Sequence, residues 1–319
     1  MILFLRSSAS RNPLARCYFY TQKPRRWKRL EKMRGVSSLG FSHSFSFITT
    51  VRLLHRRSHP TVVHSQLREC QSLEEQYQKK AKKYWDSFYK RHQNKFFKDR
   101  HYLQKDWGHY FSDDSKFVLE VGCGAGNTIF PLVAAYPKLY VHACDMSPQA
   151  IELVKSHVVF QEDRVNAFVC NVIDDNLSDY INPSSVDVVT LIFMLSAVSP
   201  KKMPLILENI KSVLKPNGFV LVRDYAVGDF AQVKLQGRNQ MIGDNFYVRG
   251  DGTCSFYFSE DFLSTLFLEA GFNTIDVSVY CKQIKNNSRG ITMDRRWIRA
   301  VFNNFNSNSP DSALIRQAR

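Results

Sequence analysis

A glycine-rich segment, Glu120-Val121-Gly122-Cys123-Gly124-Ala125-Gly126-Asn127, directly follows the apolar residues that begin at Phe117. Three glycines at alternate positions leave no side chain between the backbone and a ligand, so the chain can turn tightly and contact that ligand directly. The nicotinamide-binding fingerprint has a wider last spacing, G-x-G-x-x-G. The segment therefore predicts either a ligand site of another kind or a structural turn.

An acidic residue, Asp145, ends the apolar strand expected at 139–144, and Ser147 and Pro148 provide a helix N-cap and a first helical residue. An acid at the end of the second strand of a βαβ unit can hold two ribose hydroxyls. The alternative is a solvated loop acid. The E-x-G-x-G-x-G spacing resembles the S-adenosylmethionine loop of Rossmann-like methyltransferases. The resemblance implies S-adenosylmethionine as the cofactor, with Glu120, Gly122, Gly124, Gly126 and Asp145 among the binding residues.

Strand and helix patterns alternate along the chain from residue 117. We expect strands at 117–121, 139–144, 165–170, 186–193 and 218–223, and helices near 127–135, 148–158 and 202–214. A helix capped by Ser259 runs to Ala270 and ends at Gly271, and strands at 273–281 and 296–302 follow. The alternation predicts an α/β, Rossmann-like class I methyltransferase fold, with a mostly parallel seven-stranded sheet and helices on both faces.

The positive charge of the chain is concentrated at its N-terminal end. The chain has 319 residues and a net charge of +15, and residues 1–68 hold 14 of its 44 Lys and Arg but only one of its 29 acids. This composition is typical of an organelle transit peptide, so we expect a mitochondrial location, with a plastid as the second choice. The alternative is a disordered or untranslated extension of a cytoplasmic protein.

Four segments are expected along the chain. They are the extension at 1–68, an N-terminal helical arm at 69–115 that binds RNA and covers the cofactor, the methyltransferase domain at 116–302, and a flexible tail at 303–319. The apolar stretches of the extension are too short to span a membrane. The seven cysteines show no metal-binding spacing, so we expect reduced thiols and no metal site.

Five longer segments carry a more specific resemblance. They are residues 84–90 (YWDSFYK), 94–100 (NKFFKDR), 192–198 (IFMLSAV), 223–225 (RDY) and 245–253 (NFYVRGDGT). In this order they resemble the methyltransferase-like family that makes 3-methylcytidine in tRNA anticodon loops, and the likeness covers about residues 75–302. The resemblance implies that Trp85 and Tyr89 fold over the cofactor, that Asp145 binds its ribose, and that Ile192 lines its pocket.

One position departs from the family pattern. The family usually has an aspartate after the third strand, where it contacts the adenine amino group, whereas this chain has Asn171, followed by Val172. An asparagine carbonyl can accept the same hydrogen bond without charge assistance. We therefore expect Asn171 and Val172 in the cofactor site, and we expect Asn171→Asp to retain or tighten cofactor binding.

The chemistry of the target atom can be narrowed from the residues after the fourth strand. Phe193-Met194-Leu195-Ser196 stands where many exocyclic-amine methyltransferases of nucleic acids have N/D-P-P-Y/F, and no cysteine nucleophile for carbon-5 methylation lies there. A cytosine ring nitrogen has a lone pair that is available at neutral pH, so in-line positioning suffices. Asp224 is the candidate for orienting the base through its amino hydrogens, the alternative being an acid that merely ends a strand.

The arm combines basic and aromatic residues. Residues 79–100 hold nine Lys and Arg and two acids, interleaved with aromatic residues that can stack on unpaired bases. The alternative is an amphipathic helix with buried aromatics and solvated lysines. The expected RNA-binding residues are Lys95, Phe96, Phe97, Lys98 and Arg100, together with Arg223, Arg249, Arg295 and Arg296. The expected partners are tRNA and a helper such as an aminoacyl-tRNA synthetase.

Two other functions remain open from the sequence alone. One is a small-molecule or protein methyltransferase with a coincidentally basic arm. The other is a catalytically inactive RNA-binding scaffold, for which Asn171 is the only indication. Methyl transfer from labelled cofactor to tRNA separates the leading hypothesis, a tRNA cytidine N3-methyltransferase, from both of these alternatives.

Overall fold

A computed structural model describes residues 73–112 and 116–304. The predicted extension at 1–68 and most of the predicted tail lie outside these residues. The central feature is a seven-stranded sheet with strand order β3-β2-β1-β4-β5-β10-β9. Its strands are β1 (Phe117–Val121), β2 (Tyr140–Asp145), β3 (Val165–Val169), β4 (Val186–Ile192), β5 (Leu214–Tyr225), β9 (Asn273–Asn286) and β10 (Ile291–Asn303).

The sheet is parallel except at one side. The first five strands pair in parallel, and β10 is antiparallel to both β5 and β9. Parallel strands place their carboxyl ends at one edge of the sheet, where ligands bind in open α/β folds. The predicted class I methyltransferase topology is confirmed.

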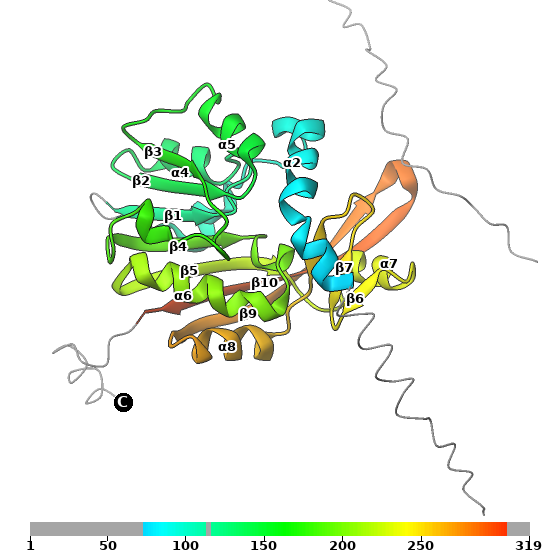
Figure 1. Ribbon diagram of the computed structural model, residues 1–319. Coiled ribbons are helices and arrows are strands. Elements are labelled where there is room, and N and C mark those ends of the chain that lie inside the picture. The colour runs from blue at the N-terminus through cyan, green and yellow to red at the C-terminus, as the bar shows by residue number, and fades with distance from the viewer. Residues whose placement is uncertain (1–72, 113–115, 305–319) are drawn as a thin grey trace, which may run out of the picture. The chain divides into compact units, whose positions relative to one another are not determined.

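Helices cover both faces of the sheet (Figure 1). They are α3 (Tyr102–Trp107), α4 (Ile129–Ala135), α5 (Pro148–Lys155), α6 (Met203–Val213) and α8 (Glu260–Glu269). One buried cluster contains apolar residues of α3, α4 and α5, and the other contains those of α6 and α8. Side chains along β4 point alternately to the two faces of the sheet, so this strand contributes to both clusters. Val188 and Ile192 belong to the first cluster, and Val189 and Leu191 belong to the second.

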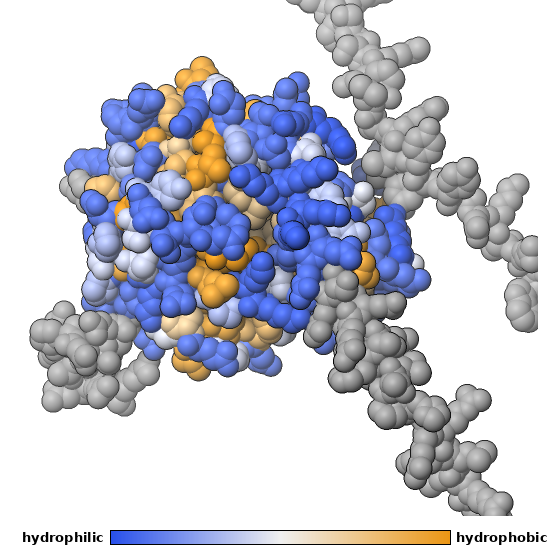
Figure 2. All heavy atoms as spheres, in the orientation of Figure 1, coloured by the Kyte–Doolittle hydropathy of each residue, from blue (hydrophilic) through white to orange (hydrophobic). Residues whose placement is uncertain are grey.

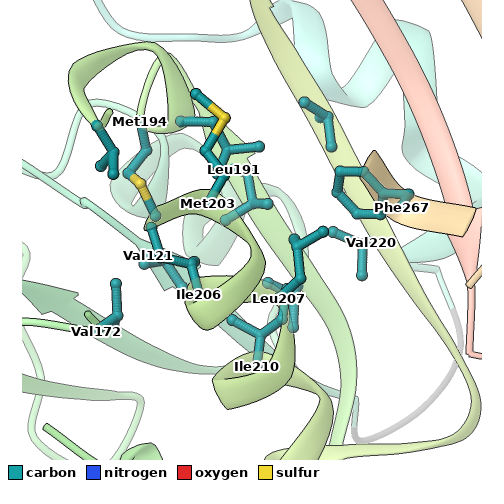
Figure 3. Close-up of a cluster of buried hydrophobic side chains, with 14 of the residues drawn as sticks. Val121, Val172, Leu191, Met194, Met203, Ile206, Leu207, Ile210, Val220 and Phe267 are labelled. Carbon is teal, nitrogen blue, oxygen red and sulfur yellow. The ribbon is translucent and has the colours of Figure 1, made fainter. Parts of the chain in front are cut away.

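The packing of α6 follows from its sequence. Met203, Ile206, Leu207 and Ile210 are spaced so that they share one helical face, and all four are fully buried. Figure 3 shows these side chains beside Val121, Leu191 and Val220 of the sheet. The result is a rigid layer beneath the carboxyl ends of β1 and β4.

The predicted helix caps are present. The Ser147 hydroxyl accepts a hydrogen bond from the Ala150 N–H, and the Ser259 hydroxyl accepts one from the Phe262 N–H. Gly271 follows α8 with a positive φ of 78°, as expected for a left-handed cap. These caps explain why the start of α5 and both ends of α8 could be located from the sequence.

The second half of the domain contains elements that the pattern did not predict. A three-stranded antiparallel sheet, β6 (Met241–Gly243), β7 (Phe246–Val248) and β8 (Cys254–Phe256), follows α7 (Phe230–Gln236). The predicted final strands are also too short. Residues 297–303 of β10 pair with β5, whereas residues 291–296 pair with β9 alone, so the end of this hairpin projects beyond the sheet (Figure 1).

The arm lies against the carboxyl edge of the sheet. Residues 73–79 are helical, and α2 (Ala81–His92) follows after a break at Lys80. Phe88 and Tyr89 of α2 are buried, and hydrophilic side chains cover its outer surface (Figure 2). No helix among the described residues is long and apolar enough to cross a membrane.

Candidate active site

The glycine loop is held against the end of β2 by backbone hydrogen bonds. The Cys144 carbonyl accepts from the N–H groups of Gly122 and Cys123 at 2.8 and 3.0 Å. The Asp145 carboxylate accepts from the Gly124 N–H at 3.0 Å through one oxygen and from the Ser147 N–H at 2.9 Å through the other. Asp145 therefore fixes the loop, and its remaining lone pairs are available to a ligand.

The absence of a side chain is required at Gly124. Its φ is +55°, and a Cβ there would lie 2.5 Å from the Tyr89 hydroxyl. Tyr89 of the arm thus rests directly on the loop. Gly126 plays a different part, since its positive φ closes the turn toward Phe130 and it lines neither of the two cavities described next.

An ionic side chain anchors the arm beside this loop. The Asp86 carboxylate accepts from the Ser147 hydroxyl at 2.9 Å and from the Gln149 N–H at 3.1 Å, at the N-terminus of α5. Burial raises the pKa of Asp86, but these hydrogen bonds outweigh it and hold the pKa below the ordinary value. Asp86 was not predicted as a site residue, yet it fixes α2 over the loop.

A cavity of about 540 Å³, here the cofactor cavity, opens where β1, β2, β3 and β4 end. It is lined by Trp85, Tyr89, Val121, Gly122, Asp145, Met146, Cys170, Asn171, Val172, Ile173, Phe193, Met194, Ala197 and Val198. The structure therefore brings together six of the predicted cofactor residues: Trp85, Tyr89, Gly122, Asp145, Asn171 and Val172.

A second cavity of about 400 Å³, here the loop cavity, adjoins the cofactor cavity and shares Trp85, Tyr89, Gly122 and Phe193 with it. Glu120, Gly122, Gly124 and Ile192 line it, and so does Arg100, which was predicted to bind RNA. Burial raises the pKa of Glu120 to about 8, and its Oε2 has no hydrogen-bond partner in the described structure. The unpaired Glu120 oxygen and the Arg100 guanidinium can therefore bind the polar groups of a ligand in this cavity.

The residues of both cavities fit S-adenosylmethionine. Asp145 offers a carboxylate to ribose hydroxyls, although burial raises its pKa to about 6. Glu120 and Arg100 can hold the amino and carboxylate groups of a methionine moiety. Trp85 provides an aromatic wall beside the cofactor cavity. The predicted cofactor residues other than Gly126 therefore all line one of these two cavities, and their contacts with the cofactor stay a prediction.

A third cavity of about 1190 Å³, here the acceptor cavity, adjoins the cofactor cavity. The two share Trp85, Phe193 and Ala197 as lining residues. Aromatic and basic residues predominate on its walls, namely Phe88, Phe96, Phe97, Tyr225, Phe230, Tyr257, Lys234, Arg238, Arg249 and Arg295. Such a cavity suits an unpaired base and its phosphates.

Phe193 lines all three cavities. Its φ of +57° is unfavourable for a bulky residue, and its N–H donates to the Arg223 carbonyl at 2.7 Å. The ring lies between the Arg100 guanidinium, 4.8 Å away, and the Tyr225 ring, 4.9 Å away. Backbone strain of this kind concentrates at functional sites. The sequence prediction did not include Phe193 among the site residues.

The direct role predicted for Asp224 requires correction. Its side chain is 0% exposed and lines none of the three cavities. Its carboxylate accepts from the backbone N–H groups of Ser196 at 2.9 Å and Tyr225 at 2.8 Å, and burial raises its pKa to about 6. Asp224 is therefore a positioning residue, because Ser196 and Tyr225 both line the acceptor cavity.

The predicted RNA-binding arginines fall into two groups. Arg249 and Arg295 line the acceptor cavity, where Arg249 donates to the Cys254 carbonyl and Arg295 forms an ion pair with the buried Asp229. Arg223 is only 14% exposed, is paired with Asp106 at 2.8 Å and lines none of the three cavities, so the structure gives no support to its predicted contact with RNA. Its charge is already neutralised by that partner. Arg296 donates to the Val227 carbonyl and lines none of the three cavities.

Of the predicted RNA-binding residues of the arm, Phe96 and Phe97 line the acceptor cavity and Arg100 lines the loop cavity. Lys95 and Lys98 are exposed, and the Phe96 side chain is 55% exposed while it packs against Phe88 and Phe97. The aromatic side of the arm therefore faces inward and the basic side faces outward. The buried aromatics and solvated lysines of the alternative reading are therefore present, and RNA binding by the arm stays a prediction.

Metal ligation and disulfide chemistry have no visible site in the described part of the chain. No group of three or more His, Cys, Asp or Glu residues there is placed to hold a metal ion. Cys123, Cys144, Cys170 and Cys254 are buried free thiols, and Cys281 is exposed.

Comparisons with known proteins agree with this geometry. A family model described as a methyltransferase domain matches residues 119–220. A solved S-adenosylmethionine-dependent methyltransferase from Anabaena variabilis has a TM-score of 0.53 at 13% identity, covering 70% of this chain and 92% of that one, which shows the fold.

Curated relatives are much closer in sequence. The human tRNA N(3)-cytidine methyltransferase METTL6 is 41% identical over 230 residues, covering 70% of this chain and 81% of its own length. The Saccharomyces cerevisiae tRNA(Thr) (cytosine(32)-N(3))-methyltransferase is 36% identical over 235 residues, covering 71% of this chain and 37% of its own length. With its fold, cavities and sequence in agreement, the chain belongs to the family of tRNA N(3)-cytidine methyltransferases.

Proposed function

We propose that this protein transfers a methyl group from S-adenosylmethionine to nitrogen 3 of a cytidine in the anticodon loop of a tRNA. The observation that carries the proposal is the wall shared by the cofactor and acceptor cavities, formed by Trp85, Phe193 and Ala197. Two ligands in adjoining cavities can react directly, as a methyl transfer requires. The names of the relatives supply the substrate class, tRNA, and the target atom.

The cofactor supplies an electrophilic methyl group on a sulfonium. On this chain Asp145 would accept from ribose hydroxyls, Asn171 would face the adenine, and Arg100 and Glu120 would hold the methionine end. Trp85 and Tyr89 of the arm close the cavity over the ligand. Because Asp86 fixes the arm to α5, Trp85 and Tyr89 are held beside the glycine loop.

The acceptor cavity suits the edge of a pyrimidine. The lone pair of cytosine nitrogen 3 lies in the plane of the ring, so the ring must present its edge to the methyl group. Aromatic side chains can hold the two faces of such a ring, and Tyr225 and Phe193 lie at the wall that leads to the cofactor. No general base is needed for this attack.

Charge moves during the step. The N–C bond forms as the S–C bond breaks, and the electron pair of the broken bond returns to sulfur. The positive charge passes to the methylated base, where aromatic faces stabilise it. The buried Asp224 carboxylate, whose pKa of about 6 leaves it mostly ionised at pH 7, adds a negative potential behind Ser196 and Tyr225.

The substrate must present an unpaired cytidine, because nitrogen 3 takes part in Watson–Crick pairing. A loop meets this condition at low energetic cost. A cavity that admits one base cannot distinguish one tRNA from another, so we include in the proposal a helper such as an aminoacyl-tRNA synthetase that presents the tRNA.

We also propose that the protein acts in an organelle, with mitochondria as the first choice. The support is the composition of residues 1–68, which hold 14 Lys and Arg and one acid. A fusion of residues 1–68 to a fluorescent protein should enter an organelle. Diffuse cytosolic fluorescence would contradict the location and would leave the chemistry untouched.

The proposed reaction is tested with purified protein, labelled S-adenosylmethionine and total tRNA. We expect label in tRNA with the wild-type protein and none with Asp145→Ala. Label in protein or small molecules but not in RNA would favour the alternative methyltransferase functions. Cofactor binding without transfer to any acceptor would favour an inactive scaffold.

A further inference from the structure

The asparagine that replaces the usual aspartate after β3 has an acidic partner of its own. The Asn171 side-chain amide nitrogen donates to the Asp174 carboxylate at 2.6 Å. The Asn171 backbone N–H donates to the Asp175 carboxylate at 2.8 Å. Asn171 also lines the cofactor cavity, whereas Asp174 does not. The sequence pattern gave no indication of this pair.

The partner determines which way the amide faces. An ionised carboxylate only accepts hydrogen bonds, so the nitrogen of the Asn171 amide must be the atom beside Asp174. The carbonyl oxygen is then directed elsewhere. It accepts one long hydrogen bond, of 3.4 Å, from the Ile173 N–H, which leaves a second lone pair for a ligand in the cavity.

We propose that Asp174 is a specificity-determining positioning residue, which locks the Asn171 amide so that its carbonyl oxygen accepts from the exocyclic amine of adenine. The inference rests on S-adenosylmethionine as the cofactor. An amide that could rotate would accept from an amine in one orientation and donate to a carbonyl oxygen in the other. Because Asp174 fixes the amide, a purine with a 6-oxo group would place its oxygen against the Asn171 carbonyl oxygen. Two acceptors cannot hydrogen-bond to each other, so such purines are excluded.

The pair also changes what an aspartate at this position would do. In Asn171→Asp a second carboxylate would replace the amide nitrogen that now lies 2.6 Å from Asp174. Two carboxylates in such contact repel each other and disfavour ionisation. The sequence-based expectation that Asn171→Asp retains or tightens binding is therefore replaced by an expected loss. Asn171 and Asp174 together supply an oriented acceptor in place of a charged one.

The test compares binding of S-adenosylhomocysteine with its hypoxanthine analogue, S-inosylhomocysteine, to the full-length protein by calorimetry. The wild-type protein should prefer the adenine compound. Asp174→Ala should weaken the adenine compound by about 2- to 10-fold, as expected for one lost hydrogen bond, and should reduce the preference by a similar or larger factor. The matched control is Asp179→Ala, which removes an exposed acid nearby without touching Asn171.

A double-mutant cycle gives a second, independent readout. Asn171→Asp should bind S-adenosylhomocysteine about 5- to 10-fold more weakly than the wild type, and adding Asp174→Asn should restore binding to within about 2-fold. Additive effects, or an unchanged preference in Asp174→Ala, would overturn the proposal. Parallel losses for both compounds with a lowered melting temperature would show a structural role only. If neither compound binds the wild-type protein, the proposed cofactor itself is wrong.

Discussion

The Arg100 guanidinium lies 4.8 Å from the centre of the Phe193 ring, which in turn packs 4.9 Å from the Tyr225 ring. These three residues come from the arm, the end of β4 and the end of β5. The stack therefore joins the arm to two strand ends at the wall between the cofactor and acceptor cavities. It gives the arm a role in both ligand sites at once.

Replacing Phe193 should affect transfer more than cofactor binding. In Phe193→Leu the bulk remains but the aromatic face is lost, so kcat for tRNA methylation should fall on the order of 10-fold or more because the base is less well held. The affinity for S-adenosylhomocysteine should change by less than about 3-fold, since one lost aromatic contact is worth little by itself. An equal loss in both measurements would show that Phe193 serves only the cofactor cavity.

Arg100 should recognise the methionine end of the cofactor. Arg100→Ala removes a charge-assisted hydrogen bond and should weaken S-adenosylhomocysteine binding by about 10- to 100-fold. Binding of 5′-methylthioadenosine, which lacks the carboxylate, should be nearly unchanged, and titration calorimetry measures both. If the two ligands weaken equally, Arg100 supports the arm and does not contact the carboxylate.

Cofactor affinity should depend on pH through Asp145. Its pKa of about 6 means that the carboxylate becomes protonated as the pH falls through 6, and a protonated acid is a poorer acceptor for ribose hydroxyls. The dissociation constant should therefore rise up to 10-fold per pH unit below that value. Asp145→Asn should bind more weakly at pH 7.5 and should lose this dependence between pH 7.5 and 5. Parallel pH profiles for both proteins would assign the titration to another group.

The exposed lysines of the arm should serve RNA. Replacing Lys95 and Lys98 with Ala should weaken tRNA binding and reduce the slope of log affinity against log salt by about 1 to 2, because two phosphate contacts are lost. Cofactor affinity should stay the same. The matched control replaces Lys138 and Lys155, which are exposed before β2 and on α5. Equal salt slopes for the test and control variants would make the arm purely structural.

Glu120 should destabilise the cofactor-free protein at high pH. Its pKa of about 8 in the folded state lies above the ordinary glutamate value of 4.5, so the folded protein binds more protons between these values. Stability is thus lost as the pH rises through this window. Glu120→Gln stays neutral and should raise the melting temperature at pH 8.5 by roughly 2–4 °C, with little change at pH 5. Glu208→Gln, an exposed acid on α6, is the control, and matching shifts in both variants would refute the burial argument.

Much of the central sheet could be predicted because its signals are local. Apolar runs, the caps at Ser147 and Ser259, and the glycine turn after β1 each depend on neighbouring residues. The small sheet of β6, β7 and β8 could not be predicted in this way. Its strands have three residues each, too few for an alternating pattern, and they are stabilised by contacts made across the chain.

The site shows the same division. Asp145 and the glycine loop follow from spacing. The roles of Arg100 and Asp224 depend on tertiary packing, because Arg100 of the arm reaches the loop cavity and the Asp224 side chain is buried outside all three cavities. Arg223 looked like an RNA ligand, but its partner Asp106 is 117 positions away in the chain, so no local pattern could reveal the pair. The contact between Asn171 and Asp174 is local, yet sequence alone does not show that the two side chains meet.

The most direct test of the central claim is the identity of the methylated nucleoside. tRNA carrying the label should be digested and its nucleosides separated by chromatography and mass spectrometry, which distinguish the 3-methyl, 4-methyl and 5-methyl isomers of cytidine. The account predicts 3-methylcytidine from an anticodon-loop position, and its absence when that cytidine is replaced by uridine. Label in 4-methylcytidine or 5-methylcytidine, or in a base-paired stem, would contradict it.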